Sequence, residues 1–121
     1  MKLNNKEKKH TFNEYLRHIS HITDKDYQKR IWIRGEGPEC QAFDDAVCDF
    51  FDIGDPILDD YKEFGITNSQ YELWVRLRNE FKEFSRRHDF PQEFIDTPEW
   101  AKIMKLAKEV LELFNYQKDV G

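Results

Sequence analysis

Apolar residues recur along most of the chain at intervals of three and four residues, which is the spacing of one face of an α-helix. The pattern is clearest between residues 43 and 51, at Phe43, Ala46, Val47, Phe50 and Phe51. Capping signals and prolines divide the apolar stripes into five helices. We expect these helices at residues 11–23, 39–52, 55–65, 67–88 and 97–115. The chain is therefore predicted to be all-α, a compact bundle of about five helices.

Two segments match the capping box, in which two side chains each bond the other residue's backbone amide. Thr11 is followed by Glu14, and Thr67 is followed by Gln70. A threonine three residues before Glu or Gln marks a helix N-terminus when an apolar stripe follows. We expect helices to begin after Thr11 and Thr67, and a further one after Thr97, where Pro98 takes the first helical position.

The acidic middle of the chain is predicted to form two short helices. Ile53-Gly54 should end the first of them, and Asp55 should cap the second, with Pro56 at its first position. Gly65 is expected to stop the second helix, since glycine is favoured directly after a helix C-terminus.

The segment from Asp24 to Arg34 carries two conflicting signals. Asp24 can cap a short helix, whereas Arg-Ile-Trp-Ile-Arg at residues 30–34 alternates as an edge strand does. A strand needs a partner, and no second strand is indicated. We therefore expect a short extended connector near residues 29–34 that inserts Ile31 and Ile33 into the core, with Trp32 as a further candidate.

The length of 121 residues fits one domain. Residues 1–10 are expected to be a flexible basic tail, residues 11–115 a single helical domain, and residues 116–121 a frayed C-terminus. Residues 89–96 should be a connector that places Phe90, Phe94 and Ile95 in the core.

Charge is distributed very unevenly along the chain. The first 34 residues carry nine Lys/Arg and four Asp/Glu, whereas residues 35–66 carry one and ten. The last 55 residues are nearly balanced, with nine and ten, so the net charge of −5 originates in the middle segment. Helical spacing places its carboxylates opposite the apolar stripe.

This acidic face is our candidate partner-binding surface. Several of its carboxylates stand four residues apart, and such like-charge pairs destabilise a helix by about 0.2–0.5 kcal/mol each. The presence of these unfavourable pairs suggests that the acidic face has a function. A merely solvated face is the alternative. Tyr61 is the candidate aromatic anchor, because tyrosine is enriched at binding hot spots. The predicted partner-binding residues are Asp44, Asp45, Asp49, Asp52, Asp55, Asp59, Asp60, Tyr61 and Glu63.

A surface of this charge favours a basic protein as partner and argues against direct binding of nucleic acid, which requires clustered Lys/Arg. No apolar run approaches the length of a membrane span, so we expect no membrane association. Cys40 and Cys48 are too far apart on a helix for a disulfide and are expected as reduced thiols, which predicts a cytoplasmic location.

No motif for catalysis or for a cofactor is recognisable, and we expect neither an enzyme nor a resident metal. His18 and His21 stand one helical turn apart. With a third ligand they make a small metal-binding protein or enzyme an alternative, although no closed ligand set is evident.

In size, helicity and charge layout the chain resembles the small acidic helical immunity proteins with which bacteria block their own nuclease toxins. The resemblance implies an inhibitor that neutralises a basic or nucleic-acid-binding partner. A structural or homo-oligomeric subunit without catalytic role is the alternative. The aromatic content of 15% favours that alternative, because some aromatic side chains would then form an interface, such as that of a homodimer.

Overall fold

The computed structural model describes residues 4–36 and 42–116. Four long helices make up most of it: α1 (Asn5–Ile22), α3 (Phe43–Asp59), α4 (Asn68–Arg87) and α6 (Pro98–Leu113). Short helical segments join them: α2 (Lys25–Tyr27), η1 (Gln28–Ile33), η2 (Tyr61–Phe64) and α5 (Pro91–Phe94). The described residues contain no strand. The prediction of a compact all-α bundle with about five helices is confirmed.

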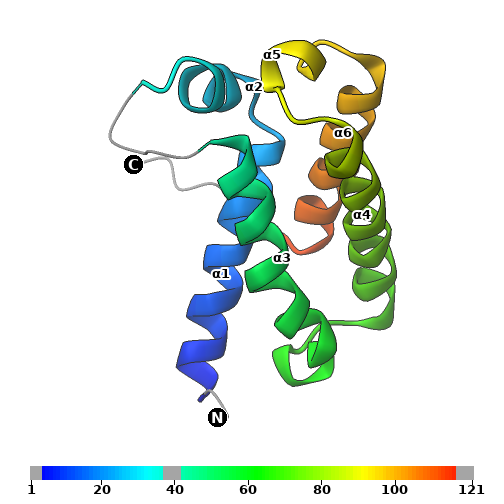
Figure 1. Cartoon of the computed structure of the whole chain (residues 1–121). Helices are drawn as coiled ribbons and strands as arrows, with labels where there is room; N and C mark the ends of the chain where they lie inside the picture. Colours follow the sequence, from blue (N-terminus) through cyan, green and yellow to red (C-terminus); the bar gives the residue numbers. More distant parts are fainter. Residues whose placement is uncertain (1–3, 37–41, 117–121) are drawn as a thin grey trace.

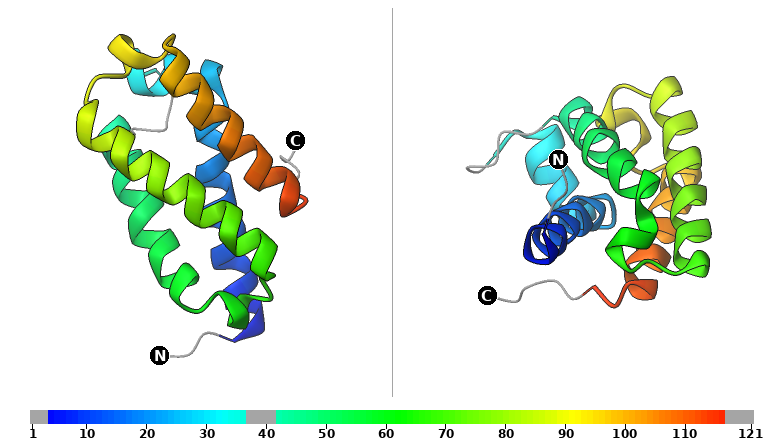
Figure 2. Two further views of the ribbon diagram at one scale, coloured as in Figure 1. Left: turned by 90° about the vertical axis from the view of Figure 1, so that its right-hand side faces the viewer. Right: turned by 90° about the horizontal axis from the view of Figure 1, so that it is seen from below.

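The four long helices alternate in direction, so that α1 and α4 run upward in Figure 1 and α3 and α6 run downward. Helix α1 packs against α3 and α6, and α4 packs against the same two helices from the other side. In the left view of Figure 2, α4 lies between α3 and α6. The short segments α2, η1 and α5 close the upper end of the bundle, and η2 closes the lower end.

Helix α1 begins earlier than the sequence analysis predicted. The Asn4 side chain accepts a hydrogen bond from the Glu7 amide (2.8 Å) and donates one to the Glu7 carboxylate (2.7 Å). This pair caps the helix at Asn4, seven residues before the expected cap, so Thr11 lies inside α1 and its predicted capping box is wrong. Residues 5–10, which were expected in a flexible tail, are the first turns of α1. The first three residues of that tail lie outside the described part of the chain.

The predicted extended connector near residues 29–34 is also wrong. Asp24 caps α2, its carboxylate accepting from the Tyr27 amide at 3.1 Å, and the chain continues as the wide helical turn η1. The alternation of residues 30–34 therefore does not separate two faces of a strand. Neighbouring Ile31 and Trp32 are both buried, while Ile33 is exposed.

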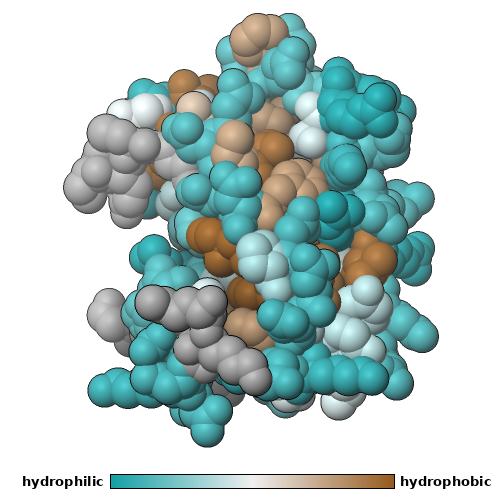
Figure 3. All heavy atoms as spheres, turned by 60° about the horizontal axis from the view of Figure 1, so that its bottom comes forward, coloured by the Kyte–Doolittle hydropathy of each residue, from teal (hydrophilic) through white to brown (hydrophobic). Residues whose placement is uncertain are grey.

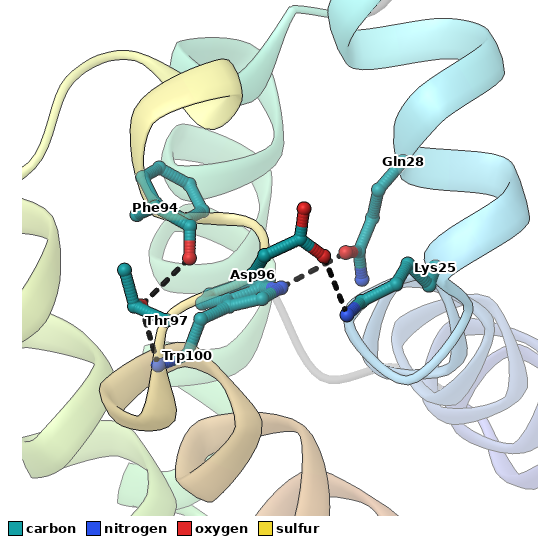
Figure 4. A network of polar contacts seen from close by, with 6 residues as sticks. All are labelled: Lys25, Gln28, Phe94, Asp96, Thr97 and Trp100. Carbon is teal, nitrogen blue, oxygen red and sulfur yellow. Dashed lines mark hydrogen bonds and ion pairs between the residues drawn. The ribbon is translucent and has the colours of Figure 1, made fainter.

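Gln28 holds this helical turn against the rest of the bundle. Its side chain is fully buried, and its amide group donates to the carbonyls of His21 and Ile22, each at 2.9 Å. Its carbonyl accepts from the Trp100 indole at 2.9 Å (Figure 4). Gln28 thus satisfies two carbonyls at the end of α1 and the only polar atom of the Trp100 ring.

The same junction is supported at its edge, where Lys25 pairs with Asp96 at 3.1 Å (Figure 4). Thr97 caps α6, its hydroxyl accepting from the Trp100 amide at 3.3 Å and donating to the Phe94 carbonyl at 2.7 Å. This start of α6 confirms the expected cap at Thr97. The capping box at the start of α4 is confirmed as well, with Thr67 and Gln70 bonded in both directions (2.8 and 3.2 Å).

The upper half of the core is a cluster of aromatic rings. Phe94 lies at its centre, with ring centroids 4.8 Å from Phe43 and 4.9 Å from both Phe84 and Trp100. These contacts bring α3, α4, α5 and α6 together. Phe90, which was also expected in the core, is instead 55% exposed, because it precedes Pro91 and lies outside the first turn of α5.

Helix α6 ends at Leu113. Apart from Tyr116, the predicted frayed C-terminus falls outside the described residues. No helix in the described part of the chain combines the length and the apolar character that crossing a membrane would require.

Candidate partner-binding surface

The acidic surface is built on one continuous helix and not on two. Helix α3 runs from Phe43 to Asp59 through both Gly54 and Pro56, so the predicted helix end at Ile53-Gly54 and the predicted cap at Asp55 are wrong. The helix tolerates Pro56 because Pro56 lies on the exposed side of α3. Asp52, whose carbonyl loses its usual hydrogen-bond donor to the proline, is exposed as well. The expected start at residue 39 is also displaced, since α3 begins at Phe43 and residues 39–41 lie outside the described part.

Continuity places the acidic side chains of α3 on one face. At about 100° per residue, positions 44, 45, 49, 52, 55 and 59 fall within an arc of roughly 140°. Asp44, Asp45, Asp52 and Asp59 are exposed, as is Asp60 directly after the helix, whereas Asp49 and Asp55 are half-buried. The opposite face is buried and holds Phe43, Ala46, Phe50, Ile57 and Leu58.

Asp45 caps the helix on which it stands. Its carboxylate accepts a hydrogen bond from the Ala42 backbone amide at 3.1 Å. Asp44 and Asp45 lie in the first turn of α3, where the unpaired amides and the helix dipole favour negative charge. Both residues thus have a structural explanation that does not depend on a partner.

Asp55 is engaged by a residue of α4. Its two carboxylate oxygens accept from Nε and Nη2 of Arg78 on α4 at 2.7 and 3.0 Å. The Arg78 guanidinium also lies 5.5 Å from the centre of the Phe51 ring. The hydrogen bonds that Arg78 donates to Asp55, together with the charges of Asp55 and Asp59, raise the pKa of Arg78. This bidentate pair joins α3 to α4, and it withdraws Asp55 from the set available to a partner.

Asp49 faces α1. Its negative charge favours the protonated form of His18, which is partly buried. Burial lowers the pKa of His18 below its usual value, and the charge of Asp49 opposes that effect. We therefore place Asp49 at the border between the acidic face and the α1 contact.

Tyr61 is half-buried and held in a fixed position. Its ring stacks on that of Tyr71, with the centroids 4.1 Å apart, and its hydroxyl donates to the Asn68 side chain at 3.0 Å. The Lys62 ammonium lies 6.0 Å from the Tyr61 ring centre. Tyr61 thus presents only part of its ring to solvent at the lower end of the acidic face.

Glu63 pairs with Lys8 of α1 at 3.4 Å, in a contact open to solvent. Lys8 also borders a cavity of about 220 Å³ at the lower end of the bundle, between Phe12, Phe64 and Phe114. Figure 3 brings this end forward and shows apolar side chains among hydrophilic ones. The acidic face therefore ends beside a small aromatic cavity.

Four of the predicted acidic side chains have no direct polar contact with the described residues. Within the described part of the chain, the carboxylates of Asp44, Asp52, Asp59 and Asp60 make no hydrogen bond or ion pair. Asp59 and Asp60 lie at the C-terminus of α3, whose last turn carries no basic residue. A negative charge there opposes the helix dipole by about 0.3–1 kcal/mol.

Sequence reasoning missed the ion pairs that Arg78 and Lys8 make with residues of this surface. Arg78 stands 23 residues from Asp55, and Lys8 stands 55 residues from Glu63. Neither separation produces a local pattern, because only the packing of α3 against α4 and of η2 against α1 creates these pairs.

The two histidines that suggested a metal are not part of a ligand set in the described residues, where no three His, Cys, Asp or Glu side chains are close enough to hold an ion. The ring centroids of His18 and His21 are 6.0 Å apart, and His21 stacks on Tyr27 at 3.9 Å. Stacking of this kind orients the His21 ring against a neighbour in the fold.

Comparison with known proteins gives no relative: no family model, no curated protein and no solved structure matches this chain.

Proposed function

We propose that this protein is a binding module that captures a basic protein partner through the acidic face of α3. In this proposal it acts as an inhibitor of immunity type, covering the cationic surface of a nucleic-acid-binding protein such as a nuclease toxin. The observation that carries the proposal is the set of four unpaired, exposed carboxylates, Asp44, Asp52, Asp59 and Asp60, on one side of α3 and its C-terminal end.

The position of these charges supports use by a partner over simple solubility. A solvated face without a partner generally mixes both signs, as α4 does with Glu83 and Arg86. Asp59 and Asp60 instead lie where the helix dipole disfavours them. A cationic partner would offset this unfavourable electrostatic energy. Charges at an interface mainly accelerate association and select the partner.

Tyr61 and the aromatic cavity at the lower end would supply the apolar part of the contact. Charged rims contribute little affinity, whereas aromatic residues near the centre of an interface contribute most of it. The stack on Tyr71 already restricts the Tyr61 ring, so binding would lose little conformational freedom there. The proposal includes a cytoplasmic location, which the exposed thiol of Cys48, unpaired among the described residues, supports.

The test compares two variants with the same change in net charge. In the face variant Asp44, Asp52, Asp59 and Asp60 become Asn. In the control, four exposed acids elsewhere are neutralised: Glu72, Asp89, Glu93 and Glu109. Proteins captured from the native host at low salt are identified, and the association rate of the purified partner is then measured against salt.

The proposal expects the wild type and the control to capture the same basic protein, and the face variant to associate at least about tenfold more slowly at low salt. Equal loss in both variants would mean that only net charge matters. Equal capture by all three would place the binding site away from α3.

A homo-oligomeric subunit is the second candidate, and one observation favours it. Phe90 is 55% exposed at the upper end of the bundle. The remaining aromatic side chains of the described residues are at least partly buried, so the aromatic content itself no longer requires an interface. A mass in solution that rises with protein concentration, and falls to that of a monomer in Phe90→Ser, would support this candidate.

A further inference from the structure

The aromatic cavity of about 220 Å³ lies at the lower end of the bundle, where α1 and α4 begin and α6 ends. Phe12 from α1, Phe64 from η2 and Phe114, directly after α6, form its apolar walls. All three side chains are half-buried, so each ring leaves part of its surface uncovered by the described residues. Figure 3 shows this end of the molecule, with apolar side chains between hydrophilic ones.

The walls of the cavity leave room for one more ring. The ring centroid of Phe12 lies 5.0 Å from that of Phe114 and 6.4 Å from that of Phe64, whereas no ring contact within the described part of the chain joins Phe64 to Phe114. Gly65 also lines the cavity, and a Cβ atom built on it would meet no atom within 4 Å. The cavity is smaller than the roughly 300–1,000 Å³ of sites for drug-sized ligands, which limits an occupant to about a single ring.

The charged residues that line this cavity are cations. Lys8 and Lys9 stand one turn before Phe12 on α1, and no aspartate or glutamate is among the described residues of the lining. Lys9 is exposed, and its ammonium makes no hydrogen bond or ion pair with any described residue. The Lys8 side chain is 19% exposed and lies 3.4 Å from the carboxylate of Glu63, which is 65% exposed. An ion pair that open to solvent contributes little, so a ligand carboxylate can replace Glu63 at Lys8.

Apolar walls and two ammonium groups together select one kind of occupant. The ammonium groups repel a cation, and the aromatic walls disfavour a small inorganic anion, because it would lose hydration without gaining apolar contacts. A ring gains edge-to-face contacts with the phenylalanines, and a carboxylate on that ring accepts charge-assisted hydrogen bonds from the lysines. The aromatic side chains of proteins carry no carboxylate, so a free aromatic acid meets both requirements better than an internal segment of a protein does.

We propose that this cavity binds a small aromatic carboxylate with a single ring. The ring lies between Phe64 and Phe114, against Phe12, and the carboxylate accepts from the ammonium groups of Lys8 and Lys9 at the mouth of the cavity. A bound ligand would compete with the apolar contact proposed above for a protein partner. Its binding does not rest on that function or on the acidic face, and it is measured on the purified protein alone, so either proposal can fail without the other.

The test titrates ¹⁵N-labelled protein with sodium benzoate and follows the amide shifts by NMR. We expect saturable shifts with a dissociation constant in the millimolar range, centred on Phe12, Phe64 and Phe114. Three compounds that each lack one feature should bind at least about tenfold more weakly, since each loses either the ring contacts or the charge-assisted hydrogen bonds. Benzylammonium chloride reverses the charge, sodium acetate lacks the ring, and N-acetylphenylalanine amide is a neutral mimic of a protein segment.

Two variants with the same change in net charge complete the test. Replacing Lys8 and Lys9 by Gln should weaken benzoate binding about threefold to tenfold, as expected for two ion pairs open to solvent. The control replaces Lys102 and Lys105, two exposed lysines of α6, by Gln and should leave the affinity unchanged. Lys9→Gln alone, at an exposed position, should show a smaller loss in the same direction.

Several results would overturn the proposal. These are the absence of saturable shifts at the cavity, equal affinity for benzoate and benzylammonium, tighter binding of N-acetylphenylalanine amide than of benzoate, and unchanged benzoate affinity in the folded variant without Lys8 and Lys9.

Discussion

The ring of Tyr15 on α1 occupies the space that a side chain at position 54 of α3 would need: a Cβ atom built on Gly54 would lie 2.6 Å from the ring. The Tyr15 hydroxyl in turn accepts a hydrogen bond from the Trp74 indole at 2.8 Å. Gly54 therefore lies inside a helix because it lets Tyr15 reach α4 through the core. The apparent helix-ending signal at Gly54 is a packing requirement.

Gly54→Ala is expected to destabilise the protein by about 1–3 kcal/mol, although alanine is the better helix former. Unfolding in urea measures the effect. In the Tyr15→Leu background the same substitution should be much less destabilising, because the ring that obstructs the methyl group is gone. Additive losses in the double variant would contradict this account.

Stability should fall in alkaline solution through Tyr15. Burial raises the pKa of its hydroxyl far above the usual range, and the hydrogen bond from Trp74 opposes this only in part. The unfolded chain ionises this group near pH 10, whereas the folded protein keeps it neutral. The contribution of Tyr15 to stability is therefore complete below about pH 10 and decreases as the pH rises above it.

Urea unfolding of wild type and Tyr15→Phe between pH 8 and about pH 11 tests this dependence. The variant loses the Trp74 hydrogen bond at every pH, so it begins less stable. Above pH 10 the difference should shrink, since only the wild type responds to ionisation of residue 15. A constant difference over the whole range would refute the assignment.

Substitution by Asn should change the free energy of unfolding more at Asp55 than at Asp52. Asp55→Asn weakens the bidentate contact with Arg78 and should destabilise by about 1 kcal/mol, a modest value because Asp55 is 40% and Arg78 25% exposed. Asp52→Asn relieves repulsion on an exposed face and should change stability by less than about 0.5 kcal/mol. Thermal unfolding of both variants at neutral pH measures the contrast, and equal effects would argue against the Arg78 pair.

Gln28→Leu is expected to be among the most damaging single changes in the described residues, at about 2–4 kcal/mol. It leaves the Trp100 indole and the Ile22 carbonyl without their partner in a buried site, and it removes one of the donors to the His21 carbonyl. The matched change at the edge of the same junction is Lys25→Met. That variant removes only a solvent-exposed ion pair and should lose less than about 1 kcal/mol in urea unfolding.

Reversing a charge at the end of α3 should separate stability from the proposed function. Asp60→Lys places a cation at the helix C-terminus and should stabilise the fold by about 0.3–1 kcal/mol in thermal unfolding. The same change should slow association with a basic partner. Stabilisation without slower association would remove Asp60 from the proposed surface.

The sequence predicted the bundle and several helix starts because those depend on local signals. Thr67 with Gln70, and Thr97 with Pro98, carry their capping chemistry within four residues. The start of α1 depends on an equally local pair, Asn4 with Glu7, which was overlooked beside the more familiar pattern at Thr11.

The errors arise where distant residues decide the local structure. Gln28 makes residues 28–33 helical through contacts with Trp100, 72 positions further along the chain. Gly54 stays within α3 because of Tyr15, 39 positions earlier. The same holds for the candidate surface. The helical spacing of its carboxylates could be predicted from the sequence, whereas the hydrogen bonds between Arg78 and Asp55 could not.

Pro56 gives the acidic face a property that its charges do not have. Because proline has no amide hydrogen, the Asp52 carbonyl lacks the donor that the residue four positions later supplies in a regular helix. A partner that donates to this carbonyl would form a neutral, directional contact that dissolved ions do not screen. Binding at the middle of α3 would then outlast, at high ionic strength, the long-range attraction that first brings the partner there.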